Sequence, residues 1–155
     1  MKRTLILTCL AMILACLPVQ AGDLDLGDYS SSTITAKAWA ALGAKNYAEA
    51  IAYANKCVEM YEKQAVDMQK ELTAPVTGDR EEVFKKWAMN DVGTCFFITG
   101  QAFEKQDKAP EALAAYKQLV EKVPFAQCWD TKGWFWKPAD AAKARLKALE
   151  FDSLK

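Results

Sequence analysis

The side chains that could perform chemistry in this chain of 155 residues are few in kind, because it contains no histidine. Ser–His and Cys–His nucleophiles and acid–base catalysis by imidazole are therefore excluded. Two carboxylates could still act as acid and base, but no spacing of Asp or Glu singles out such a pair. No glycine-rich phosphate-binding loop is present either. We therefore expect a non-enzymatic protein that uses no cofactor.

The five cysteines are the other potentially reactive side chains. Three of them, Cys57, Cys95 and Cys128, follow the segment that we expect to be removed on export. Three widely separated cysteines without histidine make a poor zinc site, so no metal is expected. An odd number in an oxidising compartment allows one internal disulfide and one free thiol, and we expect the pair Cys95–Cys128. Cys57 lies on an apolar helical face, where cysteine behaves as a small hydrophobic residue.

The segment at residues 128–138 carries an unusual aromatic load. Trp129, Trp134 and Trp136 lie within eight residues, and Phe135 adds a fourth ring. Tryptophan is enriched at the centres of protein interfaces, and it can also stack on sugar rings. In the alternative hypothesis the loop folds back and covers the end of the fold, because an exposed apolar patch is costly in a soluble protein. The binding and the covering hypotheses can both hold if one tryptophan ring stays exposed.

The beginning of the chain predicts export. Lys2 and Arg3 precede an apolar run over residues 4–17, Pro18 ends the run, and small residues follow up to Ala21. This pattern is typical of a bacterial signal peptide over residues 1–21, with a periplasmic or secreted product. Cys16 offers an alternative, a lipoprotein processing site with a lipid anchor, which we favour less. No later apolar stretch is long enough to span a bilayer.

The charge of the remaining chain excludes two classes of partner. Removal of Lys2 and Arg3 leaves 18 cations against 20 acidic residues, a net charge of −2 with interspersed signs. Neither nucleic acid nor an anionic membrane surface is favoured by such a chain. Residues 22–32 are polar and are expected to form a flexible arm, whose aspartates lack the glycine turn and closing glutamate of a calcium loop.

Apolar residues at intervals of three and four predict helices over most of the chain after this arm. Asp79 with Glu82 is a helix-start pattern, and Pro110 and Pro138 each suit the first turn of a helix. No segment alternates like a strand. We expect an all-α protein with five helices, at about residues 33–45, 47–72, 79–106, 110–123 and 138–149, and an irregular stretch over 125–137.

One pair of expected helices resembles the tetratricopeptide repeat. Phe96, Thr99, Gly100 and Phe103 are followed at the family's spacing by the second-helix set Ala112, Tyr116, Leu119 and Pro124. Small residues stand where the two helices would touch, and the proline would end the second helix. Residues 38–57 resemble an earlier repeat more weakly, with Ala38 and Ala50 at the small positions.

The distance between the two repeats predicts an extension. Ala50 and Ala112 are 62 positions apart, whereas one repeat spans ~34 residues. We expect the excess to lengthen two facing helices by roughly 14 residues each, a hairpin that projects ~20 Å. The last helix resembles an unpartnered first helix, and its Lys143, Arg145 and Lys147 are expected to form the polar face of a cap. The fold class is thus a short solenoid of antiparallel hairpins over residues 33–155.

The resemblance implies binding of peptides or proteins rather than chemistry. The first helix of each pair lines the family's groove, which by alignment would present Trp39, Leu42, Phe97, Gln101 and Lys105, unless these side chains pack on the last helix or loop. Asp91 interrupts the apolar stripe of the third expected helix. We expect it at the rim or paired with a lysine across the hairpin, although a functional role is conceivable.

Three functional hypotheses follow. The first is a scaffold or adaptor that binds another envelope or secreted protein through the groove or the tryptophan segment. The second is a carbohydrate or peptidoglycan binder that stacks sugars on Trp129, Trp134 and Trp136. The third is a structural protein that forms homo-oligomers through the extended hairpin.

Overall fold

A computed structural model describes residues 24–153 and confirms the all-α class. The predicted signal peptide, its cleavage site and the alternative lipid anchor at Cys16 lie outside the described residues. The described helices are α1 (Ser31–Gly43), α2 (Tyr47–Lys70), α3 (Arg80–Phe84), α4 (Trp87–Glu104), α5 (Ala109–Lys122) and α6 (Pro138–Asp152). Two short strands, β1 (Cys128–Trp129) and β2 (Phe135–Trp136), complete the fold.

Local sequence signals explain four of the six helix starts among the described residues. Ser30 caps α1, where its Oγ accepts a hydrogen bond from the Thr33 amide at 3.2 Å. Asp79 caps α3, where Oδ1 accepts from two backbone amides. Pro110 and Pro138 occupy the first turns of α5 and α6, where a missing N–H costs little. The last three positions confirm helix starts that the sequence predicts.

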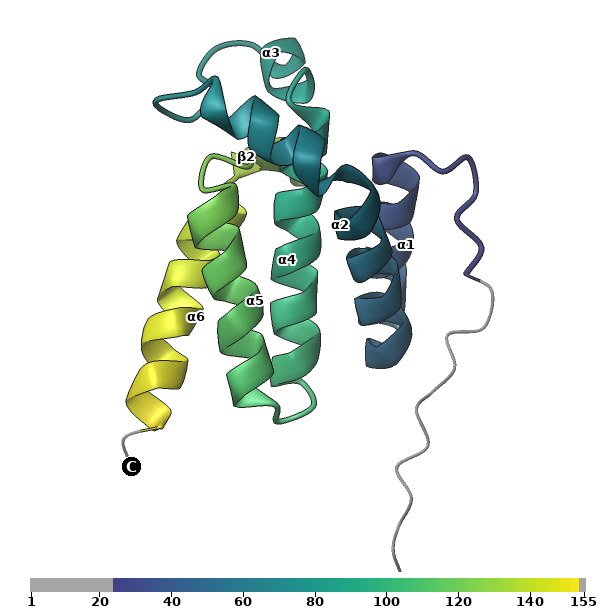
Figure 1. Cartoon of the computed structure of the whole chain (residues 1–155), viewed down its shortest axis with the longest axis vertical. Helices are drawn as coiled ribbons and strands as arrows, with labels where there is room; N and C mark the ends of the chain where they lie inside the picture. Colours follow the sequence, from purple (N-terminus) through teal and green to yellow (C-terminus); the bar gives the residue numbers. More distant parts are fainter. Residues whose placement is uncertain (1–23, 154–155) are drawn as a thin grey trace, which may run out of the picture.

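Helix α4 forms the centre of the molecule. Figure 1 shows α1, the first half of α2, α4, α5 and α6 side by side, and α4 contacts each of the other four. Every residue from Ala88 to Gly100 is buried except Asp91. The core therefore surrounds α4 on nearly all sides, and Asp91 marks the side on which it is open.

The expected straight extension of the hairpin is not found, because both of its helices change direction. The second half of α2 turns across the top of the bundle in Figure 1. There Glu62 forms an ion pair with Lys122, and Gln69 Oε1 accepts a hydrogen bond from the Phe125 amide at 3.0 Å. These contacts hold the second half of α2 against the carboxyl end of α5 instead of leaving it to project into solvent.

The third expected helix is divided into α3 and α4 by a tight turn. The Val83 carbonyl accepts hydrogen bonds from the Lys86 amide at 3.1 Å and from Asn90 Nδ2 at 2.8 Å. In a continuous helix the Val83 carbonyl would accept from the backbone amide four residues later. Here the buried side-chain amide of Asn90 donates to it instead. The turn lets α3 leave the axis of α4, so the long helix that periodicity predicts does not form.

The stretch expected to be irregular contains a small β-hairpin. Strands β1 and β2 pair antiparallel, with Cys128 opposite Trp136 and Trp129 opposite Phe135. Gly133 occupies the turn with a φ of 103°, a conformation that favours glycine. Two-residue strands are too short to show alternation in the sequence, which is why the hairpin was not predicted.

Candidate functional site

A pocket opens beside Asp91 between α1, the α3–α4 turn and strand β1. We call it the α1–α4 pocket; its volume is ≈ 380 Å³, at the small end of ligand sites. Its twelve lining residues are Ser32, Thr35, Ala36, Trp39, Phe84, Trp87, Asn90, Asp91, Thr94, Gln127, Cys128 and Trp129. None of them carries a positive charge, and Asp91 supplies the one carboxylate among them.

Aromatic rings from separate parts of the chain form the walls. Trp39 comes from α1, Trp87 from the start of α4 and Trp129 from β1. Trp87 is 42% exposed, although its ring packs edge-on against Tyr61 at 5.6 Å between centroids. Trp129 packs against Phe84 at 6.3 Å. Such rings offer large apolar contact area at low entropic cost, as in the central residues of protein interfaces.

Asp91 supplies the negative charge of this region. Its Oδ2 accepts a hydrogen bond from Ser31 Oγ of α1, and the ion pairs of residues 24–153 do not include it. The expected lysine partner across the hairpin is therefore not found. Burial raises the pKa of Asp91 to about 6, and the hydrogen bond from Ser31 offsets part of this effect.

A second acceptor in the pocket lining lacks a partner. Gln127 is 8% exposed, and its Oε1 is buried without a hydrogen-bond partner among the described residues. Neighbouring Asn90 does not supply one: its Nδ2 donates to Val83 O, and its Oδ1 accepts from the Gln127 amide at 2.9 Å. An unsatisfied buried carbonyl is costly, so Gln127 destabilises this side of the fold.

The predicted tryptophan segment does not form one continuous surface. Trp129 lines the α1–α4 pocket and packs on Phe135 at 4.8 Å between centroids. Trp136 folds back onto Phe97 of α4 at 5.1 Å, as the covering hypothesis expects. Trp134 at the hairpin tip is 50% exposed. The covering hypothesis therefore holds for Trp129 and Trp136, which pack on other rings, whereas Trp134 remains exposed to solvent.

The residues predicted to line a groove are likewise separated. Trp39 lines the α1–α4 pocket, while half-buried Leu42 packs against the core. Phe97 is buried against the ring of Tyr116, at 5.8 Å between centroids. Gln101 is half-buried and Lys105 is exposed further along α4, and neither lines the pocket. Sequence alignment thus identified one pocket residue, Trp39, while the tryptophan segment supplied Trp129.

The three described cysteines are free thiols, and the expected Cys95–Cys128 disulfide is not formed in the structure. Cys95 and Cys57 are both fully buried, and their Sγ atoms lie 3.3 Å and 3.6 Å from Thr35 Oγ1. Cys128 is half-buried, with its Sγ 3.9 Å from the Trp129 carbonyl oxygen. The burial of Cys57 agrees with its expected role as a small core residue.

We expect thiol alkylation without reductant to separate these cysteines. In native buffer Cys128 should react first, while Cys57 and Cys95 should react slower by a factor on the order of 10³ or more, because they require opening of the core. In urea, a chain starting at Gly22 should show three reactive thiols by mass spectrometry. One reactive thiol in urea, at Cys57, would instead establish the Cys95–Cys128 bond.

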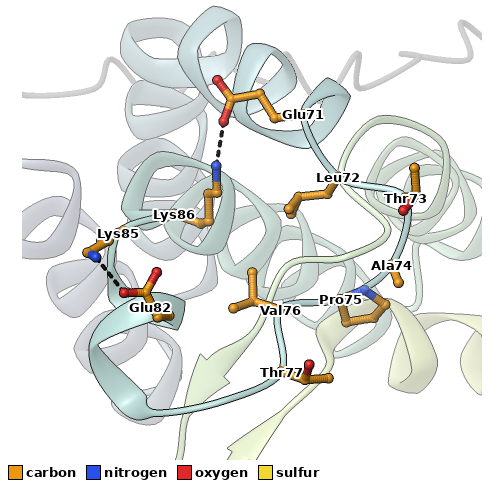
Figure 2. Close-up of a pocket in the computed structure, with 10 residues that line it drawn as sticks. All are labelled: Glu71, Leu72, Thr73, Ala74, Pro75, Val76, Thr77, Glu82, Lys85 and Lys86. Atoms are coloured by element: carbon orange, nitrogen blue, oxygen red, sulfur yellow. Dashed lines mark hydrogen bonds and ion pairs between the residues drawn. The ribbon is translucent and has the colours of Figure 1, made fainter.

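A different cavity, shown in Figure 2, lies under the loop between α2 and α3. Its volume is ≈ 430 Å³, but its four charged side chains pair with one another, Lys86 with Glu71 and Lys85 with Glu82. The other lining residues, 72–77, belong to the loop and include no aromatic ring. It therefore offers neither an unpaired charge nor the apolar walls of the α1–α4 pocket.

Two further observations bear on the chemistry. Residues 24–153 contain no group of three metal-ligating side chains that could hold an ion, and no described helix is long and apolar enough to cross a membrane. Comparison with known proteins supplies no relative, because no protein family, curated sequence or solved structure matches the chain. The functional argument therefore rests on the geometry of the pocket.

Proposed function

We propose that this protein is a non-enzymatic interaction module of the bacterial cell envelope, which binds a protein partner through the α1–α4 pocket. The observation that carries the proposal is the combination in one pocket of three tryptophans and a carboxylate that lacks a cationic partner. An unpaired, partly buried carboxylate destabilises a fold, so its presence favours a functional role.

The tetratricopeptide-like architecture remains part of this proposal, and the α4–α5 hairpin supports it. The predicted small position Gly100 lies directly against the ring of Tyr116, and Ala112 is fully buried. In this proposal, helices α1 and α4 correspond to the first helices, which line the binding groove in the resembling family. The α1–α4 pocket lies between these two helices, where that groove would be.

Two tryptophans of similar exposure allow a matched test. Trp87→Ala removes a pocket wall, whereas Trp134→Ala removes an exposed ring at the hairpin tip, outside the pocket. We expect crosslinking pull-down from the native envelope to recover one partner with wild type and with Trp134→Ala. Loss of at least 90% of this partner is expected with Trp87→Ala, since central aromatic residues contribute ≥ ~2 kcal/mol to interfaces. Circular dichroism would check that both variants are folded.

Two other results of the pull-down would contradict the proposal. Loss with Trp134→Ala alone would place the interface at the hairpin tip and refute the pocket as the binding site. No partner with any of the three proteins would refute the adaptor function. In that case quenching by glycan fragments would test the carbohydrate hypothesis, and concentration-dependent sedimentation would test self-association.

A further inference from the structure

The charge pattern of the α1–α4 pocket indicates the chemistry of its ligand. Asp91 lies where this pocket meets a second cavity of ≈ 300 Å³, lined also by Ser30, Ser31, Ser32, Tyr61 and Trp87. No Lys or Arg lines either cavity. Four titratable groups face Asp91 from α2, α4 and β1, and none of them carries a positive charge: the thiols of Cys57, Cys95 and Cys128 and the phenol of Tyr61. The site therefore offers a carboxylate without a counter-ion.

The aromatic walls of this region already bind one cation from within the chain. The guanidinium of Arg80 lies 4.3 Å from the ring centroid of Trp129 and 5.0 Å from that of Phe84. Arg80 does not line the α1–α4 pocket, and it is not among the groups that shift the pKa of Asp91. A cation between aromatic rings gains from the negative faces of those rings, and more so where water is excluded.

We propose that the α1–α4 pocket binds the ammonium group of a lysine side chain of the protein partner. An ammonium carries three N–H donors, and Oδ1 of Asp91, which accepts no hydrogen bond within the described residues, can accept one of them. The apolar stem of lysine suits the tryptophan walls. This inference rests on the proposed function and names the group that the partner inserts.

The geometry at Asp91 suits the ammonium group of lysine. A guanidinium binds a carboxylate best through two parallel hydrogen bonds, one to each oxygen. Oδ2 of Asp91 already accepts from Ser31, so Oδ1 is the oxygen that accepts no hydrogen bond within the described residues. A compact ammonium can bind at that one oxygen, whereas a two-point contact of arginine would share Oδ2 with Ser31.

Defined probes test this directly. N-acetyl-lysine methylamide would be titrated into ¹⁵N-labelled protein at pH 7.5, with N-acetyl-norleucine methylamide as the uncharged analogue and the arginine analogue as a third ligand. We expect a Kd of about 1 mM for the lysine probe, as for a small ligand with one charged contact.

Binding should also be visible at the pocket itself, where the indole N–H signals of Trp39, Trp87 and Trp129 should shift. Affinity should fall at least tenfold for norleucine, for Asp91→Asn and at pH 5.0, where the carboxylate is mostly protonated. Trp134→Ala should leave it unchanged.

Several results would overturn the inference. An ammonium site would be excluded if the norleucine probe bound as tightly as the lysine probe, or if Asp91→Asn kept the affinity of wild type. It would also be excluded if the lysine probe showed no binding at 20-fold the expected Kd. Tighter binding of the arginine probe would exclude lysine as the preferred ligand. The partner pull-down separates this failure from failure of the proposed function. If capture depends on Trp87 but persists after acetylation of the lysines in the extract, the protein-binding function stands and the lysine inference is wrong.

Discussion

Gly100→Ala is expected to destabilise the protein by about 1–3 kcal/mol, although the same change in an open helix position stabilises by up to ~1 kcal/mol. A Cβ at this position would lie 2.4 Å from Tyr116 Cε1 and within 2.7 Å of two further ring atoms. The ring cannot move aside easily. It is fully buried, packs on Phe97, and its hydroxyl donates to Glu104 Oε1 at 2.5 Å. Urea denaturation of both proteins measures the difference.

Gly43→Ala is the matched control for this change. Gly43 ends α1, and a Cβ there would meet no atom within 4 Å. We expect this variant to be as stable as wild type or slightly more stable. In a double variant, Tyr116→Leu should reduce the cost of Gly100→Ala, because it removes the colliding ring. A stabilising effect of Gly100→Ala would show that α4 and α5 can separate at no cost.

The second large effect concerns Asp91, whose pKa in the folded protein is about 6 against an ordinary value of 3.8. Between these two pH values the folded state binds more protons than the unfolded state, so stability falls as pH rises from about 4 to about 6. Above pH 6 the full penalty of roughly 3 kcal/mol applies, at 1.36 kcal/mol per pKa unit. Asp91→Asn removes this penalty and still offers an oxygen to Ser31. We expect it to stabilise the protein by about 2–3 kcal/mol at pH 7.5 and by little at pH 4, as measured by urea denaturation.

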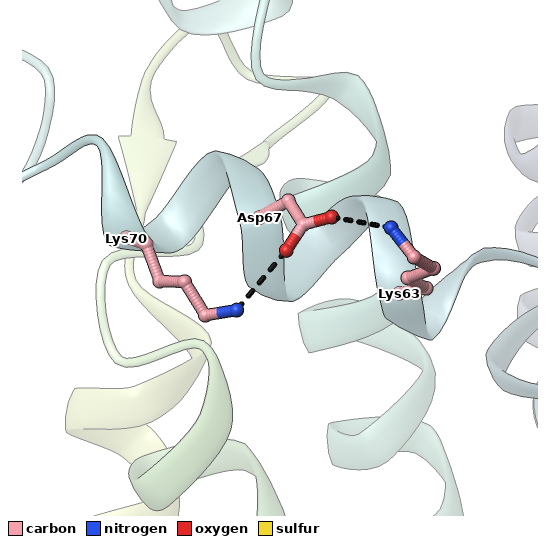
Figure 3. A network of polar contacts seen from close by, with 3 residues as sticks. All are labelled: Lys63, Asp67 and Lys70. Carbon is pink, nitrogen blue, oxygen red and sulfur yellow. Dashed lines mark hydrogen bonds and ion pairs between the residues drawn. The ribbon is translucent and has the colours of Figure 1, made fainter.

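Asp67 on α2 provides a control of opposite sign. Figure 3 shows its carboxylate between Lys63 and Lys70, with N–O distances of 2.8 Å and 3.1 Å. Hydrogen bonds from these lysines lower the pKa of Asp67, so its small stabilising contribution is present at neutral pH and lost as pH falls. Asp67→Asn should therefore slightly destabilise the protein at pH 7.5, as exposed ion pairs contribute little. Destabilisation by Asp91→Asn at pH 7.5 would show that Asp91 is charge-compensated in the folded protein.

Gain of stability and loss of lysine binding in the same Asp91→Asn variant would be informative together. Replacement of a residue with a purely structural role should not increase the stability of the fold. Replacement of a charged binding residue can increase it, because such a residue is retained for binding at the expense of stability. The carboxylate is placed on the central helix, where every neighbour from Ala88 to Gly100 is buried. Its position there is therefore best explained by a ligand that neutralises it.

The amino-acid sequence by itself determined the helical class and most helix starts. Spacings of three and four specify which face of each helix is apolar, and Ser30, Asp79, Pro110 and Pro138 act on the backbone next to them. These are local effects, so they can be inferred without knowing the fold. The sequence also identified Asp91 as a carboxylate on an apolar stripe, though not which groups would surround it.

Tertiary structure alone decided the direction of α2, the break between α3 and α4, and the pocket. The turn at Lys86 depends on a buried amide, Asn90, and α2 is held across the bundle by partners on α5 and beyond it. The pocket joins Trp39, Asp91 and Trp129, which are far apart in the chain. Periodicity describes one helix at a time, whereas a pocket depends on how helices and loops meet. The uncompensated charge of Asp91 could be recognised only once those neighbours were in place.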